Sequence, residues 1–186
     1  MVGPRVALVL SGGGARGAYE VGVLSELLPA LEERGETPRI VIGTSVGAFN
    51  TAFLAANAHR PAAEALADGV RLWHELGWRD SLAPFGAFGN QPVRRRILAQ
   101  ALGVRRTRIH ALLDPTPLEA TLARIVDFDQ LTRNVEASAL DAAAVTTTSG
   151  LSGRTVVFHS GGGSPERDSV RQIDYVGTPL TSEHVE

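Results

Sequence analysis

The chain opens with two copies of one hydrophobic pattern, in which a short continuous apolar run precedes a longer segment with apolar residues at helical spacing. The first run is Val6–Leu10, and its helical stripe extends from Ala18 to Leu31. The second run is Ile40–Ile42, which the alanine-rich apolar segment 48–58 follows. Continuous apolar runs are typical of buried parallel strands, and a stripe with a period near 3.6 is typical of an amphipathic helix. The pattern therefore predicts two neighbouring strand–helix units.

The middle of the chain is predicted to be helical. Apolar residues at helical spacing, with glycine or proline near the ends, indicate helices over 62–76, 92–102 and 116–126. The stretch 78–90 is rich in glycine, proline and phenylalanine, and we interpret it as a loop. Its Phe85 and Phe88 either pack within the domain or border a pocket.

The last third of the chain is predicted to be rich in β-structure. β-Prone runs bounded by turn residues predict strands over 135–149, 154–159 and 173–176. We interpret the Asp-Ala-Ala-Ala stretch at 141–144 as a bulge in the first of these strands, which forms a hairpin with the second. Ser-Gly-Gly-Gly-Ser-Pro at 160–165 is expected to be a loop without an anion site, because no helix follows it closely. A new helix is expected to begin after 178.

A Gly-x-Ser-x-Gly motif, Gly43-Thr-Ser45-Val-Gly47, spans the junction between the second apolar run and its helix. In a nucleophile elbow the serine occupies a strained backbone position, and the chain passes close to itself on both sides. Side chains at positions 43 and 47 would clash there, which accounts for both glycines. Such a turn exposes the Ser45 hydroxyl at the carboxyl end of a strand and points a helix N-terminus at it. An ordinary strand-to-helix turn is the alternative.

The segment Ser11–Gly17, Ser-Gly-Gly-Gly-Ala-Arg-Gly, joins the first predicted strand to its helix and matches Gly-x-Gly-x-x-Gly. A dinucleotide site with this motif needs an acidic residue at the end of the second strand. Here that strand runs into the serine turn, and the nearby glutamates fit the end of a helix: Glu32, Glu33 and Glu36. Three consecutive glycines can instead free backbone N–H groups to converge on an oxyanion. We therefore predict an oxyanion hole formed by Gly12, Gly13 and Gly14.

Composition excludes several kinds of site. The chain has no cysteine, so it offers no disulfide, thiol nucleophile or cysteine-ligated metal site. All 18 basic residues are arginine, which excludes a lysine nucleophile and a P-loop lysine. Against 20 acidic residues they give no strong field for nucleic acid.

One uncharged stretch, 40–58, suggests a membrane span on hydropathy alone. Its two glycines, three hydroxyl groups, Asn50 and Asn57 favour a buried helix after the serine turn instead. Val6–Leu10 is too short for the core of a signal peptide. We therefore predict a soluble, cytoplasmic protein that is peripheral to membranes at most.

The two glycine motifs, in this order and about thirty residues apart, resemble those of the patatin-like phospholipase family. The resemblance continues with Leu113-Asp-Pro-Thr-Pro-Leu118 and with Gly153-Arg-Thr-Val-Val-Phe-His159, and so covers nearly the whole chain. It implies an α/β fold with three layers, α/β/α, around a mainly parallel central sheet. It also implies that residues 1–186 form a single domain, which is incomplete at its C-terminus before an aspartate-bearing segment.

The resemblance implies a serine esterase or phospholipase that hydrolyses lipid acyl esters through an acyl-serine intermediate. Ser45 would be the nucleophile, and Arg16 and Gly17 would position the oxyanion loop. The expected substrates are phospholipid, lysophospholipid or another acyl ester, and no metal or other cofactor is required. A cluster of arginines either contacts a membrane surface transiently or forms a solvated helix face: Arg94, Arg95, Arg96, Arg105, Arg106 and Arg108. The oligomeric state stays open.

The general base is the missing element. The family pairs its serine with an aspartate in an Asp-Gly-Gly or Asp-Gly-Ala turn, and no such turn follows the serine motif here. Asp68-Gly69 is the one Asp-Gly pair, and it lies inside the predicted helix 62–76. The remaining candidate aspartates match no family position: Asp114, Asp127, Asp129, Asp141, Asp168 and Asp174. The chain is therefore expected to be either part of a longer enzyme or a non-catalytic fragment or pseudoenzyme that binds lipid or a partner chain.

The histidines do not supply a clear substitute for that base. A Ser-Asp-His triad or a metal site would need a recognisable spacing. None is found among the five histidines: His59, His74, His110, His159 and His184. We therefore expect them to be structural or exposed.

Overall fold

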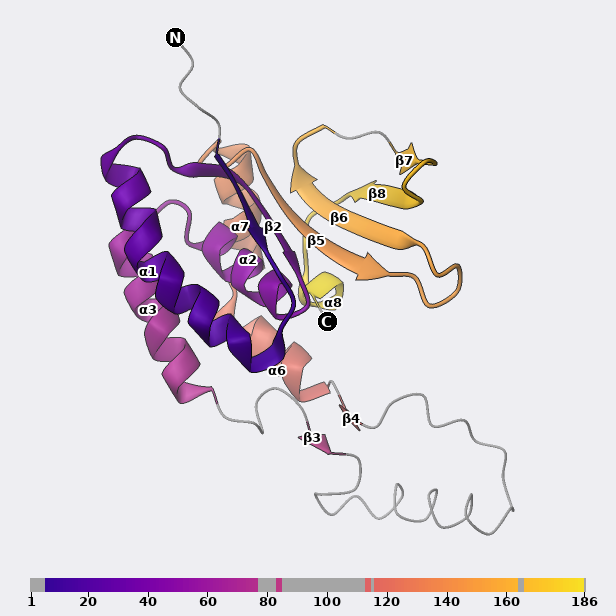
Figure 1. The fold of residues 1–186 in the computed structure, drawn as a ribbon, viewed down its shortest axis with the longest axis horizontal. Helices are drawn as coiled ribbons and strands as arrows, with labels where there is room; N and C mark the ends of the chain where they lie inside the picture. Colours follow the sequence, from indigo (N-terminus) through magenta and orange to yellow (C-terminus); the bar gives the residue numbers. More distant parts are fainter. Residues whose placement is uncertain (1–5, 77–82, 85–112, 115, 164–165, 186) are drawn as a thin grey trace.

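The computed structural model describes residues 6–76, 83–84, 113–114, 116–163 and 166–185. Its core is a six-stranded sheet in which the strands lie in the order β1-β2-β5-β6-β8-β7 (Figure 1). The strands of this sheet are β1 (Val6–Leu10), β2 (Pro38–Thr44), β5 (Ala142–Thr148), β6 (Thr155–Gly161), β7 (Arg167–Asp168) and β8 (Ile173–Gly177). A separate two-stranded sheet pairs β3 (Ala83–Pro84) with β4 (Leu113–Asp114), so a short strand lies within the predicted loop 78–90.

Six α-helices and one 3-10 helix, η1 (Gly14–Arg16), are described alongside the sheet. The α-helices are α1 (Gly17–Glu33), α2 (Val46–Ala56), α3 (Ala62–Glu75), α6 (Thr116–Ile125), α7 (Phe128–Glu136) and α8 (Ser182–Val185). The predictions for the two strand–helix units, for the helices over 62–76 and 116–126, and for a helix after 178 are confirmed. The predicted helix 92–102, the six clustered arginines, Phe85, Phe88 and His110 lie outside the described residues.

The parallel half of the sheet, β1-β2-β5, carries the helices on one face. Both β1–β2 and β2–β5 pair in parallel, and each crossover moves the chain one strand in the same direction. Because such crossovers are right-handed, successive helices then lie on the same face. Leu8, Val41 and Ala143 share that face, and the two clusters of buried apolar residues join them to the helices.

The opposite face of β1 is open among the described residues, and Val9 is 73% exposed there. The described helices therefore supply one of the two helical layers that the resemblance implies. The α/β class with a mainly parallel sheet is confirmed, since three of the five strand pairings in the large sheet are parallel: β1–β2, β2–β5 and β6–β8.

The other half of the sheet is mixed. β5 and β6 form the predicted antiparallel hairpin, and β8 adds parallel to β6. The prediction for 135–149 is wrong at its start, because Val135 lies in α7 and β5 begins at Ala142. Ala142, Ala143 and Ala144 belong to the strand without a shift in register, so the predicted bulge is also wrong.

Small side chains suit this part of β5 because α2 packs directly on it. Ala143 is fully buried on the helix-bearing face. Among the residues that the structure describes, no helix has the length and apolar character needed to span a membrane.

Candidate active site

Ser45 lies alone between the end of β2 at Thr44 and the start of α2 at Val46. Its backbone has a positive φ of 55° and a ψ of −126°. Residues other than glycine seldom adopt this conformation. The Ser45 carbonyl accepts the first helical hydrogen bond, from the Ala48 N–H at 2.8 Å, but the side chain makes no cap hydrogen bond. The residue is exposed. This is the geometry of a nucleophile elbow.

The two glycines of the motif are required by close backbone contacts. A Cβ at Gly43 would collide with the Gly47 carbonyl and would lie 2.5 Å from Thr51 Oγ1. A Cβ at Gly47 would collide with the Leu10 carbonyl and would lie 2.8 Å from Ser11 O. The turn at Ser45 therefore packs closely against the end of β1, and its two glycines pack closely against each other.

The glycine-rich loop lies beside the serine. β1 pairs with β2 so that Leu10 stands opposite Gly43, and both strands end at the same edge of the sheet. A Cβ on Gly12 would lie 3.3 Å from Ser45 Cβ and 3.9 Å from Ser45 Oγ. Within residues 6–76, no turn or loop acceptor takes the N–H groups of Gly12 or Gly13. The part of the loop next to the Ser45 hydroxyl, at Gly12, is therefore backbone without a side chain.

Two further residues of the loop are placed by packing. A Cβ on Gly13 would lie 3.2 Å from Arg16 Cβ and 3.3 Å from Arg16 Nε, so the arginine side chain folds back over the loop. Gly17 is buried at the start of α1, where a Cβ would clash with Val46 and would lie 2.7 Å from the Trp73 ring. The start of α1 can approach the elbow this closely only because position 17 is glycine.

A family model described as Patatin-like phospholipase matches residues 8–170. The chain belongs to the patatin-like phospholipase family. Lysophospholipase nte1 of Aspergillus terreus is 52% identical over 58 residues, which are 31% of this chain and 4% of that protein. Patatin-like phospholipase domain-containing protein 6 of Homo sapiens is 51% identical over 49 residues, 26% of this chain and 3% of that protein.

The chain therefore matches only a small part of the length of these curated relatives. One solved structure, the heterodimeric complex ExoU-SpcU of the type III secretion system of Pseudomonas aeruginosa, is also similar. The sequence identity is 24%, with 84% of this chain and 32% of that chain covered and a TM-score of 0.38.

Several aspartates of this patatin-like chain are held in ion pairs with arginine. Asp68 lies in α3 and pairs with Arg60 at 2.9 Å and Arg71 at 2.6 Å. The hydrogen bond from Arg60 is the main cause of the lowered pKa of Asp68. An aspartate stabilised as its anion is a weak base, so the rejection of Asp68 as the catalytic base agrees with its surroundings.

Other aspartates are held in the same way. Asp174 accepts from Arg154 at 2.8 Å and Arg167 at 2.8 Å, and the Arg154 hydrogen bond is the main cause of its lowered pKa. The Asp168 carboxylate accepts from the backbone N–H of Arg171, which lowers its pKa. In the described part of the chain, no side chain forms a hydrogen bond to Ser45 Oγ.

The described histidines have partners other than Ser45 or are exposed. His159 Nδ1 is 2.8 Å from Gly161 O, and His184 Nδ1 accepts from the Thr181 N–H at 3.0 Å while its ring packs on Phe158. His59 and His74 are exposed. No group of three histidine or acidic side chains suited to a metal ion occurs among the residues described.

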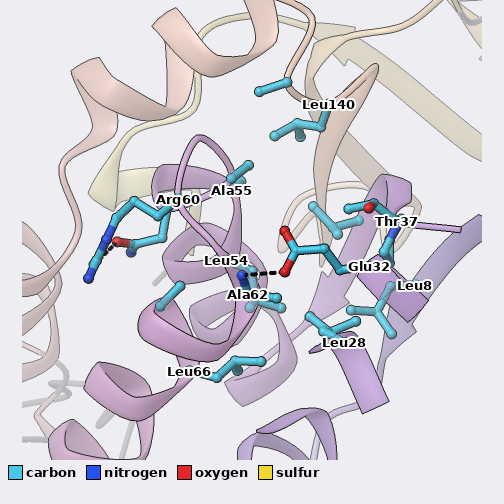
Figure 2. Close-up of a pocket in the computed structure, with 16 residues that line it drawn as sticks. Leu8, Leu28, Glu32, Thr37, Leu54, Ala55, Arg60, Ala62, Leu66 and Leu140 are labelled. Atoms are coloured by element: carbon cyan, nitrogen blue, oxygen red, sulfur yellow. Dashed lines mark hydrogen bonds between the residues drawn. The ribbon is translucent and has the colours of Figure 1, made fainter. Parts of the chain in front are cut away.

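A cavity of about 80 Å³ lies at the other end of the sheet from Ser45 (Figure 2). It opens near the start of β2 and is mostly apolar, with a lining that includes Leu8, Leu28, Leu54, Leu66 and Leu140. The carboxylate of Glu32 accepts the Ala62 N–H there at 3.0 Å. Ser45, in contrast, is exposed at the edge of the sheet where β1 and β2 end.

The sequence analysis gives no role at the site to three polar residues beside the serine loop: Glu20, Asn50 and Trp73. Their hydrogen bonds join α1, α2 and α3 at the elbow. The available signal is Asn50, a single amide within an otherwise apolar helix run. An amide at such a position is buried and therefore needs partners.

Proposed function

We propose that this chain carries the nucleophile and the oxyanion hole of a serine lipid acyl hydrolase of the phospholipase A or lysophospholipase type. The observation that carries the proposal is the juxtaposition of an exposed, left-handed Ser45 with Gly12, whose Cβ would lie 3.3 Å from Ser45 Cβ. The Ser45 hydroxyl and the backbone of the glycine loop then lie side by side, and within residues 6–76 no backbone acceptor takes the N–H groups of Gly12 or Gly13. Acyl transfer requires both features in one place.

The proposed chemistry proceeds in two steps. Ser45 Oγ attacks the ester carbonyl carbon, and the resulting oxyanion accepts hydrogen bonds from the N–H groups of Gly12, Gly13 and Gly14. Collapse expels the alcohol and leaves an acyl-serine, which water then hydrolyses. A base takes the serine proton and passes it to the leaving alcohol. The family resemblance implies an aspartate in this role, and the described residues supply none at Ser45 Oγ.

Lipid esters are the proposed substrates. The name of the fungal relative describes a lysophospholipase, and family membership favours phospholipid or lysophospholipid over a small ester. We expect the chain to act from the cytoplasm and to contact the membrane surface transiently through the arginines of 94–108.

A second candidate function is binding without turnover. It is favoured by the lack of a base at Ser45 Oγ within the described residues and by the ion pairs that occupy the aspartates of α3 and β8. In that case the chain binds lipid or a partner chain and has no hydrolytic activity of its own.

A fluorophosphonate probe and a p-nitrophenyl ester assay distinguish the two functions. The hydrolase function predicts that labelling and turnover disappear in Ser45→Ala and fall in Gly13→Ala. Ser25→Ala is the matched control, because the Ser25 hydroxyl donates to Gly22 O within α1 at 2.8 Å. Labelling that persists in Ser45→Ala would overturn the assignment of the nucleophile.

Absence of both signals from the wild-type chain would favour the binding function. Turnover that appears only after an aspartate-bearing segment is supplied would instead favour an enzyme whose dyad is completed by that segment.

A further inference from the structure

Asn50 is a buried hydrogen-bonding centre between three helices. It lies in α2, five residues after Ser45, and is 1% exposed. Its Nδ2 donates to Gly17 O at 3.1 Å and to Glu20 Oε2 at 3.1 Å, and its Oδ1 accepts from Trp73 Nε1 at 3.0 Å. Both amide protons and the oxygen are therefore used, which fixes the side chain in one orientation.

Glu20 extends this connection to the glycine-rich loop. Its Oε2 accepts from Asn50, while its Oε1 accepts from the Ser11 backbone N–H at 3.1 Å and lies 3.4 Å from Ser11 Oγ. The carboxylate also lies in the first turn of α1, where the helix dipole favours negative charge. One side chain thus joins the elbow helix to the residue that opens the loop.

Besides this anchor, the loop is held by the hydrogen bond from the Arg16 N–H to Gly13 O at 3.2 Å and by the folded-back Arg16 side chain. Ser11 directly precedes Gly12, the residue that faces Ser45, and Gly12, Gly13 and Gly14 have no side chains with which to pack. Oxyanion donors act only if they are held in place before the charge develops. Anchoring Ser11 to the elbow helix fixes the distance between the two halves of the site.

We propose that Glu20 and Asn50 are positioning residues, which hold the oxyanion loop in register with Ser45. The inference rests on the proposed function, because it assigns these residues a role in the same reaction. They touch neither the ester nor the reacting atoms. They act through the Ser11 N–H and through the Gly17 carbonyl.

Glu20→Gln tests this role with a minimal change in shape. The carboxylate presents an acceptor on each side, to Asn50 Nδ2 and to the Ser11 N–H, whereas an amide has one acceptor oxygen and one donor nitrogen. Either Ser11 or Asn50 must then lose its partner. Glu26→Gln is the matched control, since Glu26 is an exposed residue of the same helix.

The kinetic expectation is specific to an oxyanion hole. Glu20→Gln should lower kcat by about 10- to 100-fold with KM nearly unchanged, as expected for misplacement of a catalytic group. Affinity for an alkyl trifluoromethyl ketone, which forms a serine-bound oxyanion, should fall by the same factor. Unchanged kcat and ketone affinity in Glu20→Gln, with an active wild-type chain, would overturn the proposal.

A second measurement does not depend on turnover. Hydrogen exchange of the peptide that covers residues 11–16 should accelerate in Glu20→Gln and in Asn50→Leu, and should not change in Glu26→Gln. Equal exchange in Glu20→Gln and the wild type would overturn the inference even if the chain has no activity. Conversely, a wild type without serine-dependent turnover but with the expected exchange would count against the proposed function and leave the anchoring supported.

Discussion

The tetrapeptide Ser-Gly-Gly-Gly occurs twice in this chain, at Ser11–Gly14 and at Ser160–Gly163, with different results. The first copy leaves a parallel strand, enters α1 and borders Ser45. The second begins in β6, where Ser160 is buried, and leads towards the short strand β7. Its Gly161 and Gly162 are left-handed, with φ of 75° and 70°. The same four residues thus form a loop beside a serine in one place and the end of a strand in the other.

The difference lies in the element that comes after each copy. A helix after the first copy directs backbone N–H groups at the sheet edge where β2 also ends. No helix comes directly after the second copy, and its glycines serve close packing, since a Cβ on Gly161 would collide with the Asp141 carbonyl. Glycine content alone therefore does not predict an oxyanion site, and our prediction for the first copy depends on the parallel strand before it and the helix after it.

The largest effect is expected in the first copy. In Gly12→Ala the new methyl group would lie 3.3 Å from Ser45 Cβ, in the space that we propose for the ester. We expect ester turnover to fall by roughly 10²- to 10³-fold, the usual effect of losing an oxyanion donor. Steady-state kinetics, with circular dichroism to verify folding, measures this. Turnover within twofold of the wild type would show that the loop does not face the reacting ester.

The equivalent change in the second copy should affect stability and not chemistry. Gly161→Ala places a side chain on a left-handed backbone and against the Asp141 carbonyl. We expect the free energy of unfolding to fall by about 2–4 kcal/mol, as for other strained or overpacked sites. Urea unfolding measures the loss. Reactivity per folded molecule should stay equal to that of the wild type, and a selective loss of reactivity would break the comparison.

Ion pairs in the mixed half of the sheet, at the start of the strand that ends in the second copy, add a pH dependence. Hydrogen bonds from Arg154 and Arg167 lower the pKa of Asp174 in the folded state, so this contribution is present above the ordinary carboxyl pKa of about 3.9 and is lost as the pH falls through the lowered value. We expect Tm to drop below about pH 4, and to drop less in Asp174→Asn. Thermal unfolding at several pH values tests this, with Glu33→Gln as control. Parallel curves for all three proteins would refute it.

The smallest effect is expected at the last residue of the second copy. A Cβ on Gly163 would meet no atom within 4 Å. Gly163→Ala should change the free energy of unfolding by less than about 0.5 kcal/mol and leave reactivity unchanged. A clear loss of turnover would assign this segment to the site.

Much of the site's framework could be predicted from the sequence, because each part depends on local signals. The apolar run before Ser11 and the run before Gly43 define two strands that end together, and the Gly-x-Ser-x-Gly spacing is explained by local crowding. The roles of the glycine loop and the serine remain predictions that the experiments above address.

The features that the sequence did not indicate depend on contacts between distant segments. α7 begins with an Asp127 cap and buries Leu131, but its Asn134 donates to Ala55 O and Ala56 O at the end of α2. These two bonds join residues that are 79 and 78 positions apart in the sequence, so no local signal indicates them. The bond between Asn50 and Glu20 likewise spans thirty residues of sequence.

Ser45 also has a consequence for engineering. A serine at the start of a helix ordinarily contributes about 1 kcal/mol by capping it, whereas this one makes no cap bond. Its left-handed backbone costs about another 1–3 kcal/mol. A screen that ranks substitutions by heat resistance would therefore favour glycine at this position, and would discard the hydroxyl in doing so. Engineering for thermal stability should therefore leave Ser45 unchanged.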